Sequence, residues 1–354
     1  MAHRPTERSP RASASRRVPK RVARLRQAMA VAIVGVLSLG FVAALHSLGA
    51  TRGAAHDPAK ARPTPDQASV ASVVTLPAPH AVLPFQSSPM AGEGRWRPAG
   101  RPVDGHTAVY QTTVRLPDNP AVVGGIAWMD TKLLRARLYS GSVSPGGLFW
   151  KYTAPVSRRA SKTLVAAFNG GFLLKDSNGG YLSEGHLVAP LRAGAASLVI
   201  YKNGFATVGE WGRDVTMTPA VVAVRQNLTL LVDHGRPVPG LNPADVSAWG
   251  FSLYSLTNTW RSGLGVTADG ALVYVAGPMN IVDLASLLVR AGAIRAMALD
   301  MNPLWPVFAT YAPATPHGVA SSANGRDLLS TMEQSPARFF EVAYARDFIT
   351  MSAP

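Results

Sequence analysis

The stretch Arg261–Asp300 decides the fold class, and it reads RSGLGVTADGALVYVAGPMNIVDLASLLVRAGAIRAMALD. Two β-type runs, Leu264–Thr267 and Ala271–Ala276, flank the tripeptide Ala268-Asp269-Gly270. An Asp-Gly pair between apolar runs is a strong signal for a β-hairpin. We therefore predict two antiparallel strands that are joined by this turn.

A helix and a third strand follow the hairpin. Apolar residues recur at helical spacing between Asn280, a candidate N-cap, and Gly292, a candidate C-terminal glycine. The run Ile294–Leu299 then predicts a strand that delivers Asp300 at its carboxyl end. Strand, helix and strand form a βαβ-like unit, and ligands favour the carboxyl ends of strands in such units.

The β-type pattern extends back to about Glu93. Further strands are predicted at Ala121–Trp128, Leu133–Tyr139, Thr163–Phe168, Ser197–Tyr201 and Phe205–Val208. Asn203-Gly204 separates the last two and predicts a hairpin with a type I′ turn, which needs positive φ at both central residues. Strands dominate and helices are few. For residues 93–354 we therefore predict one α+β domain of mostly antiparallel sheets with a few packing helices.

The N-terminal part has the pattern of a membrane anchor. Residues 1–27 hold eight arginines, one lysine and one glutamate, within a chain of formal net charge +15. The apolar run Ala28–Leu45 is long enough for one transmembrane helix. We predict a basic cytoplasmic tail at 1–27, a transmembrane signal anchor at 28–50 and a Pro/Ala-rich tether at 51–92.

The charges around Ala28–Leu45 predict the orientation. Basic residues lie almost entirely before the run, so the N-terminus is predicted to be cytoplasmic and the domain extracytoplasmic, on a single-pass protein of the cell membrane. A cleaved signal peptide is an alternative, but the run exceeds the ~7–15 residues of a signal h-region, and Leu48-Gly49-Ala50 is a poor cleavage site. A buried helix of a soluble protein is a third interpretation.

The composition excludes several classes of site. The chain has no cysteine, which excludes disulfides, Cys-ligated metal centres and thiol nucleophiles. It contains no nucleophile elbow, phosphate loop or dinucleotide fingerprint. The four histidines after Glu93 show no local zinc-binding spacing. Because the basic tail lies behind a hydrophobic span, we predict no nucleic-acid partner.

Three segments carry candidate functional residues. Asn169-Gly170-Gly171 follows a predicted buried strand, and glycines let backbone amides approach a ligand closely. Arg261 stands in a glycine-rich segment, where a guanidinium suits a phosphate or carboxylate. Asp300 ends a strand, where carboxylates act in acid–base chemistry or bind metal. Taken singly, each has a structural alternative, namely a tight turn, a surface arginine and a turn or cap aspartate.

Two further residues complete the set. Glu184, in the loop Glu184-Gly185-His186, is a second candidate catalytic carboxylate, although a lone loop glutamate is more often solvated. Asn302 follows Asp300 closely and is a candidate substrate-binding residue. The sequence assigns no metal ligands and leaves the cofactor open, with a divalent cation as one candidate.

The order and spacing of these segments resemble the phosphodiester glycosidase family over roughly Val122 to Phe348. A strand ending in N-G-G-F, a hairpin, R-x-x-x-G-V-T-x-D-G, a helix and a strand ending in L-D follow one another as in that family. The resemblance implies an α+β domain. It also implies hydrolysis of the bond between a sugar anomeric carbon and a phosphodiester.

The resemblance implies roles for the candidate residues. Arg261 is expected to hold the phosphodiester anion. Asn169 and the Gly170 and Gly171 amides are expected to position the sugar or the phosphate. Asp300 and Glu184 are then the catalytic carboxylates, in an order that the sequence leaves open.

One departure from the family pattern follows Asp300. The family continues with D-G-G-G-S, whereas this chain continues as Met301-Asn302-Pro303-Leu304. These residues do not supply the same loop of approachable amides, and proline has no N–H. We predict a membrane-anchored extracytoplasmic hydrolase of a glycosyl phosphodiester or related envelope glycan, with a phosphorylated glycan or cell-envelope polymer as partner. A non-catalytic envelope-glycan binding module is the alternative.

Overall fold

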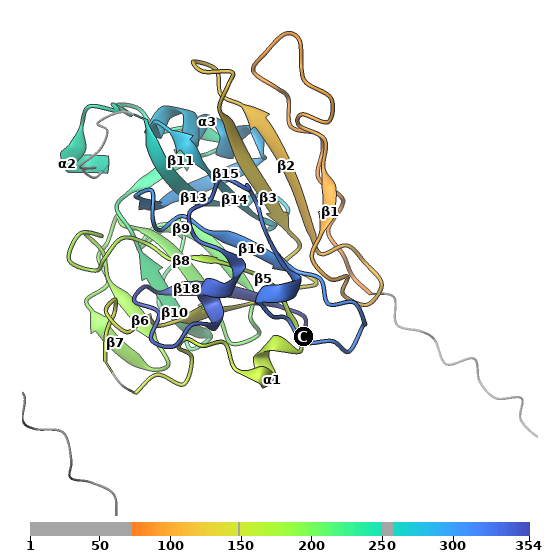
Figure 1. Cartoon of the computed structure of the whole chain (residues 1–354). Helices are drawn as coiled ribbons and strands as arrows, with labels where there is room; N and C mark the ends of the chain where they lie inside the picture. The colour runs from red at the N-terminus through yellow and green to blue at the C-terminus, as the bar shows by residue number, and fades with distance from the viewer. Residues whose placement is uncertain (1–72, 148, 250–257) are drawn as a thin grey trace, which may run out of the picture. The chain divides into compact units, whose positions relative to one another are not determined.

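The structure, a computed structural model, describes residues 73–147, 149–249 and 258–354 (Figure 1). The predicted basic tail, the predicted transmembrane helix Ala28–Leu45 and the first part of the predicted tether lie outside these residues. Within the described ranges, no helix combines the length and the apolar character that a membrane span requires.

One large sheet has eight strands. In spatial order they are β1 (Arg97–Ala99), β2 (Val109–Arg115), β3 (Val123–Met129), β14 (Leu272–Met279), β13 (Thr259–Thr267), β15 (Ala293–Met301), β11 (Leu230–Asp233) and β12 (Arg236–Pro237). Strands far apart in the sequence are thus neighbours, since β3 pairs with β14.

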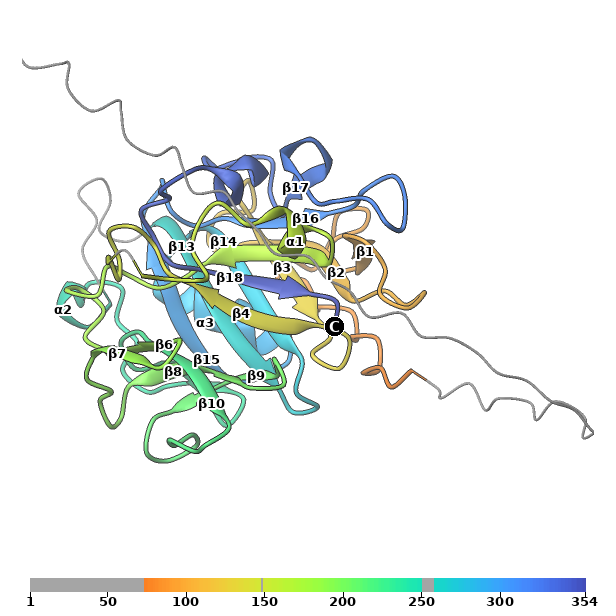
Figure 2. The same cartoon turned by 90° about the horizontal axis from the view of Figure 1, so that it is seen from below.

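Two smaller sheets have five strands each. The first consists of β7 (His186–Ala189), β6 (Tyr181–Ser183), β10 (Val221–Gln226), β8 (Ala196–Tyr201) and β9 (Ala206–Glu210). The second consists of β17 (Gly325–Asp327), β16 (Phe308–Tyr311), β5 (Leu164–Asn169), β18 (Phe348–Ser352) and β4 (Arg135–Tyr139). Figure 2 shows β4 and β18 side by side.

Helices are few among the described residues. They are α1 (Arg158–Ser161), α2 (Val246–Trp249), α3 (Ile281–Arg290) and the 3-10 helices η1 (Ser322–Asn324) and η2 (Pro336–Phe340). The strand pairs of the three sheets are antiparallel. The prediction of mostly antiparallel sheets with a few packing helices is therefore confirmed for the domain.

The predicted βαβ-like unit is present in a split form. β14 and β15 both pair antiparallel with β13, so they run parallel to each other with β13 between them. In the chain, α3 connects β14 to β15. Asn280 is its N-cap, because the Asn280 side chain accepts a hydrogen bond from the backbone N–H of Asp283, as predicted. Gly292 follows the helix with φ of +92°, a conformation that favours glycine.

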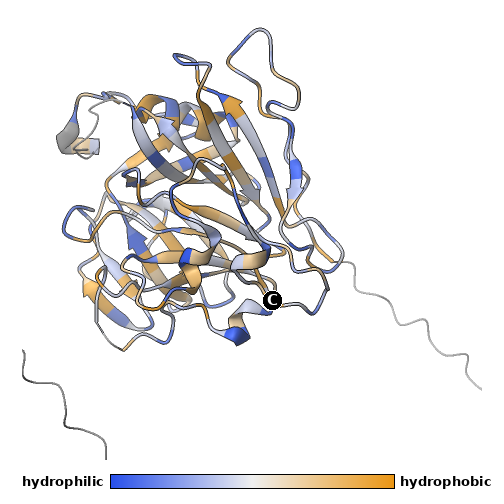
Figure 3. Ribbon diagram, viewed as in Figure 1, coloured by the Kyte–Doolittle hydropathy of each residue, from blue (hydrophilic) through white to orange (hydrophobic). Residues whose placement is uncertain are grey.

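The core lies on both faces of the eight-stranded sheet. Because side chains alternate along a strand, Val273 and Val275 of β14 pack with α3, whereas Leu272, Tyr274 and Ala276 face the two smaller sheets. Hydrophobic residues accordingly follow the central strands (Figure 3). The three sheets therefore meet in one shared apolar core.

The Asn203-Gly204 hairpin is confirmed, but its turn differs from the prediction. β8 and β9 pair from Ala196↔Glu210 to Ile200↔Ala206. In the turn only Gly204 has positive φ, at +79°, so this is not the expected type I′ turn. The Asn203 side chain instead accepts a hydrogen bond from the N–H of Phe205 and stabilises a longer loop.

Part of the predicted tether contacts the domain. The backbone N–H of Leu76 donates to the carboxylate of Asp130, and Val82 is buried. The carbonyl of Leu83 accepts a hydrogen bond from Arg290 on α3. Residues between 73 and 92 thus pack along the domain surface.

Candidate functional site

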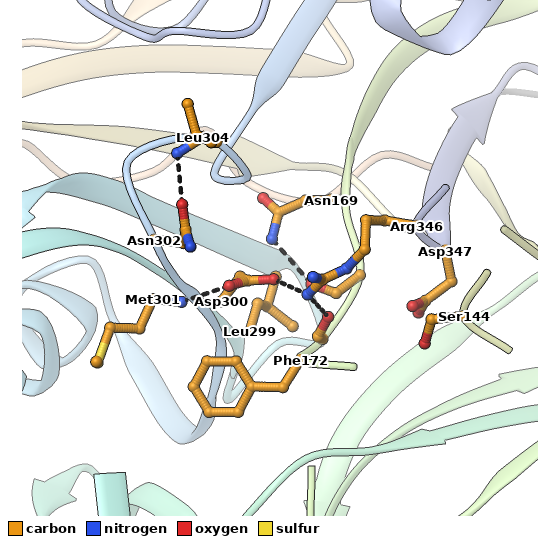
Figure 4. Close-up of polar contacts among 12 residues, drawn as sticks. Ser144, Asn169, Phe172, Leu299, Asp300, Met301, Asn302, Leu304, Arg346 and Asp347 are labelled. Atoms are coloured by element: carbon orange, nitrogen blue, oxygen red, sulfur yellow. Dashed lines mark hydrogen bonds and ion pairs between the residues drawn. The ribbon is translucent and has the colours of Figure 1, made fainter. Parts of the chain in front are cut away.

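Asp300 lies near the end of β15 and is 4% exposed. One carboxylate oxygen, Oδ1, accepts a hydrogen bond from the N–H of Met301 at 2.7 Å, and Oδ2 forms an ion pair with the guanidinium of Arg346 (Figure 4). Its backbone N–H donates to Ser262 Oγ at 3.2 Å. Two contacts therefore hold the predicted carboxylate, and a third fixes the backbone of the same residue.

A β-bulge aims Asp300 at these partners. Arg261 pairs with Met301 and Gly263 pairs with Ala298, so both Leu299 and Asp300 lie opposite Ser262. Such an extra residue breaks the strict alternation of side chains along the strand. The side chain of Asp300 can therefore lie on the same side of the sheet as Ser262. Regular alternation after Leu299 would place it on the opposite side.

Burial dominates the electrostatics of Asp300. Loss of hydration raises its pKa to about 6, while the positive charge of Arg346 and the N–H of Met301 oppose this rise. The pKa of this carboxyl thus lies much closer to neutrality than that of an ordinary aspartate. Perturbed carboxyl groups of this kind are common in catalytic sites, although structural ion pairs produce them as well.

A second buried ion pair adjoins the first. Arg225 of β10 donates to Asp347, with 2.8 Å between Nε and Oδ2, and both side chains are almost completely buried. Arg225 also donates to the carbonyls of Phe172 and Gln226. Because Asp347 follows Arg346 directly, the two pairs share the segment that leads into β18.

The two glycines after β5 make room for these charged groups. The N–H of Gly170 donates to the carbonyl of Asp347, and the carbonyl of Gly171 accepts from Arg346. A Cβ on Gly170 would lie 2.1 Å from Asp347 Oδ2, and a Cβ on Gly171 would lie 2.9 Å from the guanidinium of Arg225. The close approach that the sequence predicted for a ligand is made here to protein side chains.

Asn169 is a buried hub between the sheets. Its Nδ2 donates to Ser262 Oγ at 3.0 Å and to the carbonyl of Gly170, while Oδ1 accepts from the Tyr274 hydroxyl at 2.7 Å and from the N–H of Val307. Ser262 therefore connects Asn169 to Asp300. Both ends of the Asn169 amide are engaged, so its contact with a substrate stays a prediction.

Arg261 lies on the other side of the sheet from Ser262. The sequence placed it at the head of a strand, and the structure places it inside β13, where it is 3% exposed. Its guanidinium donates to the carbonyls of Met279 and Trp249. No carboxylate in the described part of the chain forms an ion pair with it, and burial lowers its pKa to about 10.

Glu184 lies in the turn between β6 and β7. Its carboxylate accepts hydrogen bonds from the N–H groups of Lys151 and Tyr152 at 2.9 and 2.8 Å. The side chain lines a cavity of about 480 Å³ whose lining residues include neither Asp300 nor Arg261. The structure thus does not join the two predicted carboxylates through contacts, and a shared catalytic role stays a prediction.

Asn302 shapes the loop that replaces the glycines of the family pattern. Its Oδ1 accepts from the N–H of Leu304 at 2.9 Å, and its carbonyl accepts from the N–H of Trp305. The turn brings Trp305 over Arg346, with 4.8 Å between the guanidinium carbon and the ring centre. Arg346 is therefore enclosed between Asp300 and an aromatic ring.

Sequence reasoning missed five residues of this network, namely Ser262, Tyr274, Arg225, Arg346 and Asp347. Arg225 gave one usable signal, because an arginine inside the apolar strand VVAVRQ needs a buried partner. Nothing local identified Asp347 as that partner, since it lies 122 positions away.

The described residues contain no group of three or more histidine, aspartate and glutamate side chains that could hold a metal ion. Asp300 already forms an ion pair with Arg346 through Oδ2 and accepts a hydrogen bond from the N–H of Met301 through Oδ1. The cofactor therefore stays open, with a divalent cation as one candidate.

The part of the chain that carries Asn169 and Asp300 is similar to a class of glycosidases. Residues 162–300 match the model of the phosphodiester glycosidase family, which confirms the resemblance seen in the sequence. This match indicates a glycosidase-type function. Among curated proteins, none matches the sequence.

The solved structures that are similar to the chain include the following three. The catalytic domain of zebrafish N-acetylglucosamine-1-phosphodiester alpha-N-acetylglucosaminidase, auto-inhibited by its pro-peptide, is 16% identical, with a TM-score of 0.44 and coverage of 72% of this chain and 87% of that one. A hypothetical protein from Synechocystis is 12% identical, with a TM-score of 0.39 and coverage of 73% of this chain and 64% of that one. A putative exported protein from Burkholderia pseudomallei is 14% identical, with a TM-score of 0.35 and coverage of 66% of this chain and 74% of that one.

Proposed function

We propose that this chain is a membrane-anchored, extracytoplasmic hydrolase that acts on a glycosyl phosphodiester or a related envelope glycan. The observation that carries the proposal is the buried, perturbed carboxyl group of Asp300, which lies at the end of the region that matches the phosphodiester glycosidase family. This residue is a buried carboxylate whose pKa is raised to about 6 and whose orientation is fixed by Arg346 and Met301.

Asp300 is the proposed catalytic carboxylate. Cleavage at an anomeric carbon develops positive charge on the sugar, and a nearby carboxylate stabilises that charge or activates the attacking water. The hydrogen bonds from Arg346 and Met301 favour the ionised form. A carboxylate has about four acceptor sites, so these two bonds leave capacity for a substrate or water.

Arg261 is the proposed partner of the phosphodiester anion. It is buried and, within the described ranges, has no carboxylate partner, so a bound anion would neutralise it. Its backbone pairs with that of Met301, next to Asp300. A substrate that contacts both side chains would have to reach around the end of β15.

The membrane anchor is proposed from the sequence alone. Ala28–Leu45 follows a strongly basic flank, which favours a cytoplasmic N-terminus. We expect a periplasmic-type reporter fused after residue 60 to be active and a cytoplasmic-type reporter to be silent. Replacing the six basic residues nearest the span with neutral ones should randomise this orientation, whereas the opposite reporter pattern in the unaltered chain would refute the anchor.

A binding module without catalysis is the second candidate function. Both oxygens of Asp300 are already engaged, and the Met301–Trp305 loop stands where the family pattern has glycines. These contacts would suit a domain that holds an envelope glycan without cleaving it.

Turnover of sugar-1-phosphodiesters separates the two candidates. The full chain in mild detergent would be assayed on a series of such substrates, with and without divalent cations. We expect Asp300→Asn to abolish hydrolysis with little loss of binding, because Asn keeps the shape but not the charge. Exposed Asp104→Asn is the matched control and should keep full activity. Glycan binding without hydrolysis across the series would establish the binding module instead.

A further inference from the structure

A cavity of about 480 Å³ lies away from the Asp300 network. Its walls come from β4, β8, β10 and β18, and the turn after β6 contributes Glu184. None of the residues that hold Asp300 or Asn169 lines it. Its volume falls within the range of about 300–1,000 Å³ that is usual for small-molecule sites.

Three basic side chains line this cavity, namely Arg135, Arg137 and Lys202. Arg135 donates to backbone carbonyls of its own segment, including that of Lys132 at 3.0 Å. The guanidinium of Arg137 lies 4.1 Å from the ring centre of Tyr152, which fixes its position without neutralising it. In the described structure none of the three forms an ion pair with a carboxylate.

The acidic side chain in the wall is engaged elsewhere. Glu184 accepts two hydrogen bonds from the backbone N–H groups of Lys151 and Tyr152, at 2.9 and 2.8 Å, which stabilise its carboxylate and direct it toward the loop that carries Tyr152. Arg137 and Lys202 therefore keep donors that are free to meet a bound anion.

The rest of the wall combines apolar side chains, such as those of Leu138, Ile200 and Val222, with several hydroxyl and amide groups. Thr163, Thr350, Ser352 and Tyr139 line the cavity, together with Asn203 at the tip of the β8–β9 hairpin. Burial raises the pKa of Tyr139 above its usual range, so its hydroxyl is even less prone to ionise than that of an ordinary tyrosine. A mostly apolar wall with a few hydrogen-bonding groups is usual for a small-molecule site, and these hydroxyl and amide groups can bind the hydroxyls of a sugar ring.

We propose that this cavity is a second ligand site for an anionic saccharide of one or two rings that carries a phosphate or a carboxylate. Arg137 and Lys202 bind the anionic group, and the hydroxyl-bearing wall binds the sugar ring. The site is separate from the proposed catalytic site and does not depend on hydrolysis.

Isothermal titration calorimetry on the full chain in mild detergent tests the site. The probes are glucose 1-phosphate and glucuronate, with neutral glucose as the control ligand. We expect both anions to bind and glucose to bind at least tenfold more weakly. Arg137→Gln and Lys202→Gln should each weaken anion binding about tenfold, as expected for one lost charge-assisted hydrogen bond. Exposed Lys132→Gln removes the same charge outside the cavity and should leave the affinity unchanged.

Asp300→Asn separates this site from the proposed catalytic one. The proposal requires anion binding to survive in this variant, whether or not the chain hydrolyses phosphodiesters. Failure of both anions to bind would overturn the proposal. It would also be overturned if the two cavity variants bound like the wild type, or if Asp300→Asn abolished the binding.

Discussion

Arg346 and Asp300, which lie 46 positions apart, form a buried ion pair that ties the segment before β18 to the end of β15. The same guanidinium donates to the carbonyl of Gly171 and lies against the ring of Trp305. One side chain therefore links three segments around the proposed catalytic carboxylate.

Arg346→Met should destabilise the protein by about 3–5 kcal/mol at neutral pH. The change leaves a buried carboxylate without its partner, which is the costly way to break a buried ion pair. Chemical denaturation measures the loss. Arg346→Met combined with Asp300→Asn should lose clearly less, because no charge is left uncompensated. The control is Arg338→Gln, which removes a more exposed pair with Glu341 and should cost about 1 kcal/mol or less. Equal losses in Arg346→Met and Arg338→Gln would contradict a buried, energetically important pair.

Asp300 should make the stability of the protein depend on pH. Its folded pKa of about 6 exceeds the unfolded value of about 3.9, so the folded state binds more protons between these values. The stability that the folded state gains from this proton is therefore fully present below about pH 4 and is lost as the pH rises through about 6. Thermal unfolding from pH 4 to 7 should show the wild type losing on the order of 2 kcal/mol relative to Asp300→Asn. A constant difference between the two proteins would show that the carboxyl does not titrate in this window.

Gly170→Ala should destabilise the domain by about 1–3 kcal/mol or more, the range for overpacking a buried site. The added Cβ would meet the Asp347 carboxylate and displace the ion pair with Arg225. Gly235→Ala is a useful comparison, because Gly235 has positive φ but nothing within 4 Å of the added atom. That variant should lose only the backbone cost of about 1 kcal/mol. If Gly170→Ala were as thermally stable as the wild type, the Asp347 carboxylate could move away from the added Cβ without loss of its ion pair with Arg225.

Gly204→Val should disturb the β8–β9 hairpin and its contact with β4. The position has φ of +79°, and a Cβ would lie 2.6 Å from the Cβ of Arg135. Positive φ and a steric clash both oppose valine, so we expect a loss of more than 1 kcal/mol. Asn203→Asp, which keeps the acceptor that caps the turn, should be nearly neutral. Differential scanning calorimetry compares the two variants, and a loss for Asp as large as for Val would argue against this turn geometry.

The sequence by itself predicted the local structure of the domain. The hairpins at Asp269-Gly270 and Asn203-Gly204, the helix cap at Asn280 and the strand that carries Asp300 near its carboxyl end were expected from short-range patterns, although the turn at Asn203-Gly204 is not of the predicted type. These features depend on residues within a few positions of one another, and capping and turn chemistry act over that range. The family resemblance also came from such ordered segments, and the match over residues 162–300 confirms it.

Only the tertiary structure decided which side chains meet. Arg225 finds Asp347 across 122 positions, and the bulge at Leu299–Asp300 turns a predicted strand-end carboxylate toward Arg346. Neither contact follows from local propensity, because each requires strands of different sheets to be placed side by side. No hydrogen bond or ion pair among the described residues joins Glu184 to Asp300, so the sequence-based grouping of the two carboxylates stays a prediction. Buried charges need partners whatever their distance along the chain, and that requirement is satisfied only when the three sheets close around a common core.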